Sequence, residues 1–586
     1  MRLSTIKYIF SSSLLFTNIL ASTIPEHETT DQSSKYVILP FNKLVGDSYE
    51  DATPDKKPHF ALVKRDGSYE NVAIKNEQSF YSVELLIGTP SQKITVLVDT
   101  GSSDLWIMGS DNPYCASTSN GKNVMRKDDS NLPDGILFTE ITVTNLSDLT
   151  GFFSDFSFIP MSETDIPTGV TSTNTVGGPV FPTQTNNIAL SERTIDCSQY
   201  GTFDKNQSST FQTNFTSFLT SYGDSTFASG TWAHDVLNLG GLNITGLSFA
   251  VANMSNSTVG VLGIGLPGLE TTYSGSTSKL YQYNNFPMLL KQSGAIDSTS
   301  YSLFLDDLDA KQGSVLFGAV DHTKYVGNLY TVPMVNILAS KGYPNPIQFD
   351  VTLAGIGIQN DSKNYTVTTN KFPALLDSGT TISYFPQEVV QTIARQLGAR
   401  YSSALGFYAM SCNGVSSSTN FVFDFGGFHI TGPVSDFLLP TSGNTCVLAM
   451  APQESQHILL GDIFLTHAYV VYDLDNYEIS LAQANTGTQN LDSNIQIISD
   501  SVPSAIKAPL YSETWSKAMP ISTGGNIFTV PANGSATSTH SGSRVTSGSS
   551  TSATGSQKKN GAPALMVGSS SSIFGSLLSL IMAYLL

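Results

Sequence analysis

The sequence predicts an all-β protein built from two lobes, and three features carry this prediction. Charged residues make up only 13% of the 586 residues, whereas Ser, Thr, Gly, Val, Tyr and Phe are plentiful, a composition that favours β-structure. From Tyr81 to Ala482, short apolar runs are broken by Gly, Asn, Asp and Ser, which indicates many strands. The third feature is a repeat: VDTGSSDLW begins at Val98, and LDSGTTISYF begins at Leu376. One such turn in each half predicts two β-rich lobes, because the chain is too long for a single core.

The formal net charge of −18 narrows the classes of partner. Nucleic acids and anionic membrane surfaces repel an acidic chain, so we expect neither as a direct partner. The charge suits work at low pH or on basic substrates, although solubility alone would also explain it.

Both ends of the chain carry targeting signals. Residues 1–21 combine Arg2 and Lys7 with a short apolar run and a small residue at the end, which predicts a signal peptide. Residues 573–586 are apolar but too short to span a bilayer comfortably as a helix. Small residues from Asn560 and a spacer precede them, which predicts a glycosylphosphatidylinositol (GPI) anchor attached at Asn560. The alternative to a GPI signal is that the C-terminal segment is a tail anchor or a frayed end.

The chain between these signals divides by composition. A polar pro-segment is expected to end at the dibasic pair Lys64–Arg65, although such pairs also occur as ordinary surface charge. One clear helix is expected, from Gln387 to Leu397 after Pro386. The expected units are the signal peptide 1–21, the pro-segment 22–65, an N-terminal lobe 66–300 with an acidic loop insertion at 116–196, a C-terminal lobe 301–486, a Ser/Thr-rich stalk 487–560 and a removed anchor signal 561–586.

The four cysteines are expected to form disulfides, because the leader directs the chain to an oxidising compartment. Three pairings exist, and the layout favours Cys115–Cys197 and Cys412–Cys446, since each pair brackets a loop between strand-like runs. Arg126–Lys127 is a candidate cleavage point in the insertion, so the protein is expected as a monomer, either intact or as two chains joined by the first disulfide. Nine N-glycosylation sequons fit a secretory route: Asn145, Asn206, Asn214, Asn243, Asn253, Asn256, Asn360, Asn364 and Asn533.

The repeated turn suggests a specific chemistry. Two carboxylates held in contact, here Asp99 and Asp377, cannot both ionise cheaply, so they share one proton and their pKa values separate. The ionised member can draw a proton from a water held between them, and that water can attack a peptide carbonyl while the protonated member supports the oxyanion. Neither a metal nor a cofactor is required. Gly101 and Gly379 are expected to allow the tight turns. Thr100 and Ser378 are expected to form hydrogen bonds across the pair, and Ser102 and Thr380 to hold each carboxylate in place.

These residues resemble the active site of the pepsin-type aspartic proteases, for which proton sharing by two aspartates is well established. The resemblance runs from about Tyr81 to Ala482 outside the insertion, and it implies a bilobal pepsin-like fold with the active-site cleft between the lobes. It also implies that Asp99 and Asp377 are the catalytic pair. SYGDSTFASGTW, GVLGIGLP and HILLGDIFLTHAYVVYDLDNYEISLA resemble the flap hairpin of the family and the strands behind each aspartate. The implied flap and substrate-binding residues are Tyr222, Gly223, Asp224, Thr226 and Trp106.

The targeting signals narrow the resemblance. Leader, dibasic pro-boundary, acidic insertion, stalk and anchor signal together resemble the yapsins, the surface-anchored aspartic proteases of yeasts. Yapsins cleave after single or paired basic residues, so the resemblance implies an endopeptidase that processes secreted or cell-wall proteins at such sites. Asp224 would then face the substrate residue before the scissile bond, where a buried ion pair with Lys or Arg discriminates strongly; a solvated hairpin acid is the alternative. The implied location is the plasma membrane, through the GPI anchor, with wall glucan as a further attachment.

Two other functions compete with this interpretation. A catalytically silent wall mannoprotein with a protease-like fold would share the stalk and the sequons, but it would not need both aspartates and their hydroxyl partners. Glycoside hydrolysis by two carboxylates needs a wider spacing and has no other support. His234 and His467 lack metal-ligand partners in the sequence, so we expect structural roles for both and no metal site.

Overall fold

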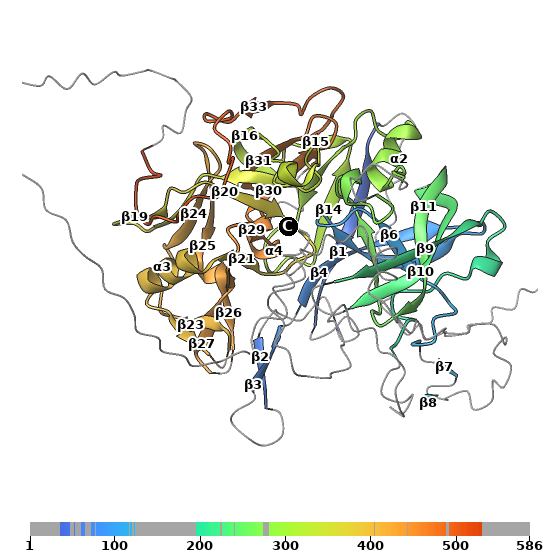
Figure 1. Ribbon diagram of the computed structural model, residues 1–586, viewed down its shortest axis with the longest axis horizontal. Coiled ribbons are helices and arrows are strands. Elements are labelled where there is room, and N and C mark those ends of the chain that lie inside the picture. Colours follow the sequence, from blue (N-terminus) through green and yellow to red (C-terminus); the bar gives the residue numbers. More distant parts are fainter. Residues whose placement is uncertain are drawn as a thin grey trace, which may run out of the picture.

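The computed structural model describes residues 35–46, 52, 60–64, 72–76, 78–115, 118–119, 122–123, 195–222, 226–239, 241–273, 281–403, 405–441, 443–487 and 492–529. Strands dominate, and they form two lobes: strands of the first half of the chain lie on one side and most strands of the second half on the other, with β1 and β14 between them (Figure 1). The all-β, bilobal prediction is confirmed.

A 14-stranded sheet runs through both lobes. Its strands follow in the order β33-β16-β31-β30-β13-β14-β1-β4-β5-β12-β6-β11-β10-β9. Their bounds are β1 Val37–Gly46, β4 Gln78–Ile87, β5 Gln92–Asp99, β6 Leu105–Met108, β9 Gln212–Ser221, β10 Phe227–Leu239, β11 Leu242–Ser255, β12 Gly260–Gly263, β13 Ser300–Phe304, β14 Gln312–Phe317, β16 Tyr325–Pro333, β30 Ala468–Asp473, β31 Glu478–Ala484 and β33 Ala505–Lys507.

Smaller sheets complete the fold. A five-stranded sheet in the second lobe has the order β17-β20-β29-β21-β28, and its bounds are β17 Asp350–Leu353, β20 Phe372–Leu376, β29 Ile458–Leu460, β21 Ser383–Pro386 and β28 Met450–Gln453. One four-stranded sheet has the order β19 Asn364–Thr368, β18 Gly355–Gln359, β24 Asn420–Asp424 and β25 His429–Pro433. A second has the order β22 Arg400–Ser402, β23 Phe407–Ser411, β27 Thr445–Leu448 and β26 Leu438–Pro440. Strand pairs are β15 Ala319–Asp321 with β32 Ile495–Ile497, β2 Phe60–Lys64 with β3 Val72–Asn76, and β7 Thr118–Ser119 with β8 Lys122–Asn123.

Helices are short and few among the described residues. The helix expected after Pro386 is confirmed: α3 spans Gln387–Leu397 and buries Val389, Val390 and Ile393 against the second lobe. The other helical elements are α2 Phe286–Gln292, α4 Asp462–Leu465 and the 3-10 turns η2 Lys205–Gln207, η3 Pro267–Leu269, η4 Ala339–Lys341 and η5 Val434–Phe437. Among the described residues, none of these helices could span a lipid bilayer.

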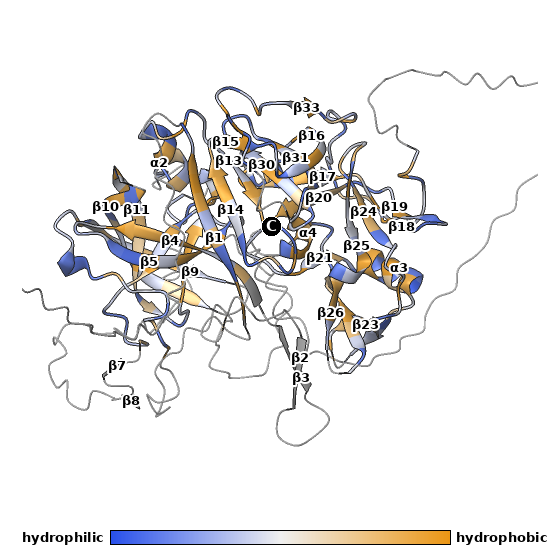
Figure 2. Ribbon diagram, turned by 180° about the vertical axis from the view of Figure 1, so that it is seen from behind, coloured by the Kyte–Doolittle hydropathy of each residue, from blue (hydrophilic) through white to orange (hydrophobic). Residues whose placement is uncertain are grey.

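The main core crosses from one lobe to the other. A single cluster of buried apolar side chains includes Val98 beside the first aspartate and Leu376 beside the second. Figure 2 shows hydrophobic stretches, in orange, on strands of both lobes. Both acidic turns therefore lie on rigid, buried strands. The structure also pairs Cys115 with Cys197 and Cys412 with Cys446, the pairs that the sequence layout favours.

Part of the expected pro-segment is a central strand. β1 pairs antiparallel with β14 on one side and with β4 on the other. Val37, Leu39 and Phe41 alternate along it and are at most 5% exposed, which explains why a segment that reads as polar overall enters the core.

The strands continue past residue 486, where the second lobe was expected to end. β32 pairs with β15, and β33 runs parallel to β16. Ile498, Val502 and Ile527 are buried. The expectation of a stalk is therefore wrong for residues 492–529, which we call the C-terminal extension, because their widely spaced apolar side chains pack into the second lobe.

Candidate active site

The two aspartates occupy equivalent positions in the two lobes. Asp99 ends β5, which runs parallel to β12, and Gly263 is its register partner. Asp377 directly follows β20, which runs parallel to β29, and its amide donates to the Leu460 carbonyl oxygen at 3.0 Å. In each lobe a buried strand thus delivers an aspartate into a turn. This is the arrangement that the repeated motif predicts.

Each carboxylate accepts the same two hydrogen bonds from its own turn. The Gly101 amide donates to Asp99 Oδ1 at 2.8 Å, and the Ser102 hydroxyl donates to Asp99 Oδ2. The Gly379 amide donates to Asp377 Oδ1 at 2.9 Å, and the Thr380 hydroxyl donates to Asp377 Oδ2 at 2.7 Å. The carboxylate planes are therefore fixed by equivalent donors, which leaves little freedom for reorientation.

The glycines set how closely the two turns approach. A Cβ on Gly101 would lie 2.6 Å from Asp377 Oδ1, and a Cβ on Gly379 would lie 2.5 Å from Asp99 Oδ1. Both contacts are impossibly short, so each turn needs glycine in order to admit the carboxylate of the other lobe. The two acids meet, as proton sharing requires.

Burial and the charge of the neighbouring aspartate raise the pKa of Asp99. Burial raises the pKa of Asp99 to about 7, and the neighbouring Asp377 charge adds to this, whereas the hydrogen bonds from Ser102 and Gly101 lower it. Asp99 is 7% exposed and Asp377 is 3% exposed. Burial and the neighbouring charge therefore favour a proton on Asp99 at acidic pH.

Tyr222, the tyrosine expected in the flap, is hydrogen-bonded to the first lobe. Trp106, on β6, donates its indole N–H to the Tyr222 hydroxyl at 2.7 Å, and the Tyr222 amide donates to the Thr226 carbonyl oxygen at 2.9 Å across the β9–β10 hairpin. Burial raises the pKa of Tyr222, and the Asp99 charge adds to this, so the hairpin end lies near the dyad. Gly223 and Asp224, at the hairpin tip, lie outside the described residues.

A buried acid cluster beside the first turn was missed by sequence reasoning. Asp104 Oδ1 accepts the Tyr283 hydroxyl proton at 2.6 Å, and Oδ2 accepts the Thr271 amide at 2.9 Å. Glu270, 1% exposed, accepts the Tyr283 amide at 3.0 Å. The available signal was Asp104 itself, an acid inside the first motif, whereas Glu270 and Tyr283 lie in a loop without a pattern.

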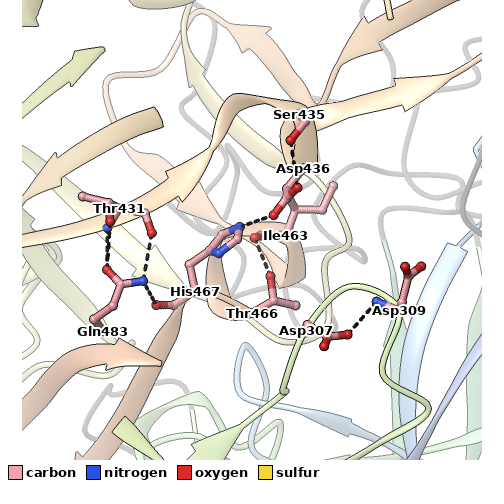
Figure 3. A network of polar contacts seen from close by, with 9 residues as sticks. All are labelled: Asp307, Asp309, Thr431, Ser435, Asp436, Ile463, Thr466, His467 and Gln483. Atoms are coloured by element: carbon pink, nitrogen blue, oxygen red, sulfur yellow. Dashed lines mark hydrogen bonds and ion pairs between the residues drawn. The ribbon is translucent and has the colours of Figure 1, made fainter. Parts of the chain in front are cut away.

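His467 lies in a polar network of the second lobe (Figure 3). Its ring stacks on Phe437, with 5.6 Å between centroids, and Nε2 lies 3.5 Å from Asp436 Oδ2, which is too long for a good hydrogen bond. Burial lowers the pKa of His467 to about 4, so its imidazole is neutral. His234 contacts the Ser248 hydroxyl at 3.0 Å.

Only some of the expected glycosylation, processing and anchor sites lie among the residues that the structure describes. Six sequon asparagines lie on the surface, five of them exposed and Asn360 half-buried: Asn206, Asn243, Asn253, Asn256, Asn360 and Asn364. Lys64 ends β2, and the side chains of Lys64 and Asn214 are not described. The other expected sites lie outside the described residues: Arg65, Arg126, Lys127, Asn145, Asn533 and Asn560.

Comparison with known proteins gives one consistent result. The family model of the eukaryotic aspartyl proteases matches residues 80–484. Aspartic proteinase 3 of Saccharomyces cerevisiae is 53% identical, and the match covers 96% of this chain and 97% of that protein. Aspartic proteinase MKC7 of the same yeast is 49% identical over 91% of this chain and 87% of the relative. Aspartic proteinase yapsin-3 is 46% identical over 86% and 83%.

Proposed function

The chain belongs to the eukaryotic aspartyl protease family as a yapsin-like aspartic endopeptidase, and from this membership we propose that Asp99 and Asp377 are its catalytic pair and that it cleaves after single or paired basic residues at the cell surface. The observation that carries the proposal is the symmetric contact of two buried carboxylates, each fixed by an amide and a hydroxyl of its own turn. A catalytically silent wall protein would not need this arrangement.

The proposed chemistry starts with one proton on the dyad, carried by Asp99. Asp377 takes a proton from a water between the carboxylates, and the water oxygen attacks the peptide carbonyl carbon. Asp99 gives its proton to the carbonyl oxygen, which forms a gem-diol. The C–N bond then breaks as Asp377 passes its proton to the leaving nitrogen and a diol hydroxyl returns a proton to Asp99. The dyad ends in its starting state, with no metal and no covalent intermediate.

Basic specificity is proposed to come from the flap. Tyr222 and Thr226 bracket the hairpin tip, and Asp224 lies two residues after the tyrosine that approaches the dyad. An acid there would face the substrate residue before the scissile bond, P1. A Lys or Arg side chain excluded from water would pair with it, and an uncharged side chain would leave it unpaired.

The pro-segment is proposed to be an integral part of the precursor. Lys43, on β1, is 4% exposed and donates its ammonium to the Leu308 carbonyl oxygen at 2.8 Å. Burial lowers the pKa of Lys43, whereas the charges of Asp462, Asp307 and Asp309 raise it. Cleavage after Arg65 would cut the covalent link between β1 and the rest of the sheet, and the acids around Lys43 would then hold it non-covalently.

Surface attachment is proposed from the sequence signals at the two ends. A signal peptide, surface sequons and a GPI signal after the polar segment that follows residue 529 fit a glycoprotein anchored to the plasma membrane, with wall glucan as a further attachment. The proposed substrates are secreted or wall proteins with exposed basic residues. The insertion, cut at Arg126–Lys127, would leave two chains joined by Cys115–Cys197.

The test is a peptide assay at acidic pH with the wild-type protein and the Asp377→Asn variant. Peptides with Lys or Arg at P1 should be cleaved by the wild-type protein and not by the variant, and replacement of the basic residue by norleucine should reduce kcat/KM at least tenfold. Asp361→Asn, in the exposed turn between β18 and β19, is the matched control for loss of one carboxylate. Equal turnover by wild type and Asp377→Asn would refute the catalytic assignment.

A further inference from the structure

Two buried tyrosines are stacked on neighbouring strands of the 14-stranded sheet. Tyr301, on β13, is directly opposite Tyr472, on β30. Their rings stack with 4.8 Å between centroids, and neither residue is exposed. Phe349 packs against both rings, with 6.3 Å between its centroid and that of Tyr301 and 4.6 Å to that of Tyr472. The Tyr301 ring is therefore held by two other rings, which fixes the position of its hydroxyl oxygen.

The Tyr301 hydroxyl reaches the segment behind the first aspartate. It donates to the Ile264 carbonyl oxygen at 3.0 Å. Ile264 is buried and directly follows β12, the strand whose last residue, Gly263, is in register with Asp99. A phenylalanine would fill the same space as the tyrosine, so what the hydroxyl adds is this one hydrogen bond to the backbone.

Ile264 and the residue after it hold both ends of the first acidic turn. The Ile264 amide donates to the Asp99 carbonyl oxygen at 2.9 Å, and the Gly265 amide donates to the Ser102 carbonyl oxygen at 2.8 Å. A Cβ on Gly265 would lie 2.7 Å from that Ser102 oxygen, so the two segments are in direct contact. Because the Ser102 hydroxyl donates to Asp99 Oδ2, a movement of the Ile264–Gly265 peptide would misalign the carboxylate and its donor.

The second lobe holds its turn with helix α4. The Asp462 amide donates to the Thr380 carbonyl oxygen at 2.7 Å, and the Thr380 hydroxyl in turn holds the second catalytic carboxylate. The carbonyl oxygen of the same peptide, that of Gly461, accepts the amides of Phe464 at 2.9 Å and Leu465 at 3.0 Å. Amides of the helix therefore fix the peptide that supports the second turn.

The first lobe cannot use the same device. The residue three positions after Ile264 is Pro267, which has no N–H, whereas Phe464 stands three positions after Gly461 and donates from there. The Ile264 carbonyl receives the Tyr301 hydroxyl instead. In the first lobe a side chain thus supplies the donor that helix amides supply in the second.

We propose that Tyr301 is a positioning residue of the dyad, whose hydroxyl fixes the Ile264–Gly265 peptide and thereby aligns Asp99 with the Ser102 hydroxyl. The inference rests on the proposed function, in which Asp99 belongs to the catalytic pair. Without the hydroxyl, the buried Ile264 carbonyl loses this donor, and the turn that the peptide supports gains freedom. A misaligned carboxylate slows the chemical step and leaves the other contacts with the substrate unchanged, so kcat falls and KM does not rise.

The first test removes the hydroxyl alone. For Tyr301→Phe we expect kcat on a P1-Lys peptide at acidic pH to fall about 5- to 30-fold, the range set by loss of a buried hydrogen bond, with KM within about twofold of wild type. Tyr469→Phe is the matched control, because Tyr469 is also buried and accepts the Asp321 amide at 2.8 Å, in a separate core cluster. It should lose similar stability in denaturant unfolding and keep kcat within about twofold. Unchanged kcat in Tyr301→Phe, or equal losses in both variants, would overturn the proposal.

The pH profile separates positioning from stability. Asp377 faces Asp99 from the second turn, and Tyr222 and Tyr301 face it from the hairpin and from β13; burial raises the pKa of both tyrosines, so both are neutral where the dyad titrates. The Ser102 hydrogen bond lowers the pKa of Asp99, so its loosening in Tyr301→Phe should move the decline of kcat/KM to higher pH. In a Ser102→Ala background, Tyr301→Phe should add no further shift. A further shift there, or no shift in the single variant, would contradict the proposed route through Ser102.

Hydrogen exchange followed by mass spectrometry gives a readout that does not depend on turnover. Peptides that contain Ile264 and Gly265 should exchange faster in Tyr301→Phe than in wild type, and at the wild-type rate in Tyr469→Phe. Unchanged exchange in Tyr301→Phe, or a Tyr301→Phe chain that does not fold while Tyr469→Phe does, would overturn the proposal. The Asp377→Asn variant separates the two levels: its turnover concerns the catalytic pair, and exchange in the Tyr301 variant concerns the positioning of the first turn.

Discussion

Thr100 and Ser378 exchange hydrogen bonds from one lobe to the other. The Thr100 amide donates to Ser378 Oγ at 3.2 Å, and the Ser378 amide donates to Thr100 Oγ1 at 2.9 Å. Each hydroxyl donates in turn to the carbonyl oxygen before the opposite aspartate, Thr100 to Leu376 at 2.9 Å and Ser378 to Val98 at 3.2 Å. The two turns are thereby joined into one unit, so the distance between the carboxylates depends on two hydroxyls.

Removal of the Ser378 hydroxyl should weaken this unit. Ser378→Ala leaves the Thr100 amide and the Val98 carbonyl buried without a partner, which costs about 1–3 kcal/mol of the free energy of unfolding. Ser378→Thr keeps the hydroxyl and should retain activity within a few-fold. Denaturant unfolding measures the difference, with Ser403→Ala at an exposed position as the control. Equal stability of Ser378→Ala and wild type would show that the exchange is not a structural requirement.

The shared proton predicts how activity depends on pH. Since the pKa of Asp99 is raised to about 7, kcat/KM should fall as the pH rises through about 7 and the dyad loses this proton. Ser102 donates a hydrogen bond that lowers the pKa of Asp99, so Ser102→Ala should move the decline to higher pH. A pH profile of kcat/KM for both proteins checks this. Activity that increases from pH 6 to pH 9 would contradict the assignment of the proton to Asp99.

The sequence predicted the structure best where a feature is specified by residues that are close together in the chain. The two turns and helix α3 could be predicted because each is specified by adjacent residues or by a family motif. β1 could not be predicted as part of the sheet, since its partners β14 and β4 are known only from the fold. Tyr301 and Ile264 are separated by 37 residues, and only the fold brings them together.

Glu270 predicts an unusual dependence of stability on pH. Burial raises the pKa of Glu270 to about 9, and the Asp104 charge adds to this. In the unfolded chain its pKa is about 4.3, so between these two values the folded protein keeps a proton that the unfolded chain has lost. Folding then becomes less favourable as the pH rises through this window.

The neutral isostere should remove this cost. Glu270→Gln can still accept the Tyr283 amide, and it should raise the free energy of unfolding by on the order of 3 kcal/mol at pH 7 and by little near pH 4. Denaturant titrations at the two pH values measure the effect, with Asp361→Asn as an exposed control. A gain of the same size at both pH values would mean that the change acts through packing rather than through the proton.

The C-terminal extension predicts where the folded unit ends. Ile498 is fully buried in a cluster with Val320, Leu329 and Tyr469, and Ile527 is 2% exposed against Gly355 and Gly357. The extension also forms hydrogen bonds with the second lobe, among them the Trp515 amide to Thr352 Oγ1 at 2.8 Å.

A chain that stops after Gly487 should therefore lose about 3–6 kcal/mol of the free energy of unfolding, because burial of each isoleucine contributes about 1.5–3 kcal/mol. A chain that stops after Thr529 keeps every contact described here and should match the full-length protein. Thermal and denaturant unfolding of the two truncations, with cleavage of a P1-Lys peptide as the measure of an intact dyad, separates the two endings. If both truncations unfold alike, the extension lies on the lobe without supporting it, and the folded unit ends with β31.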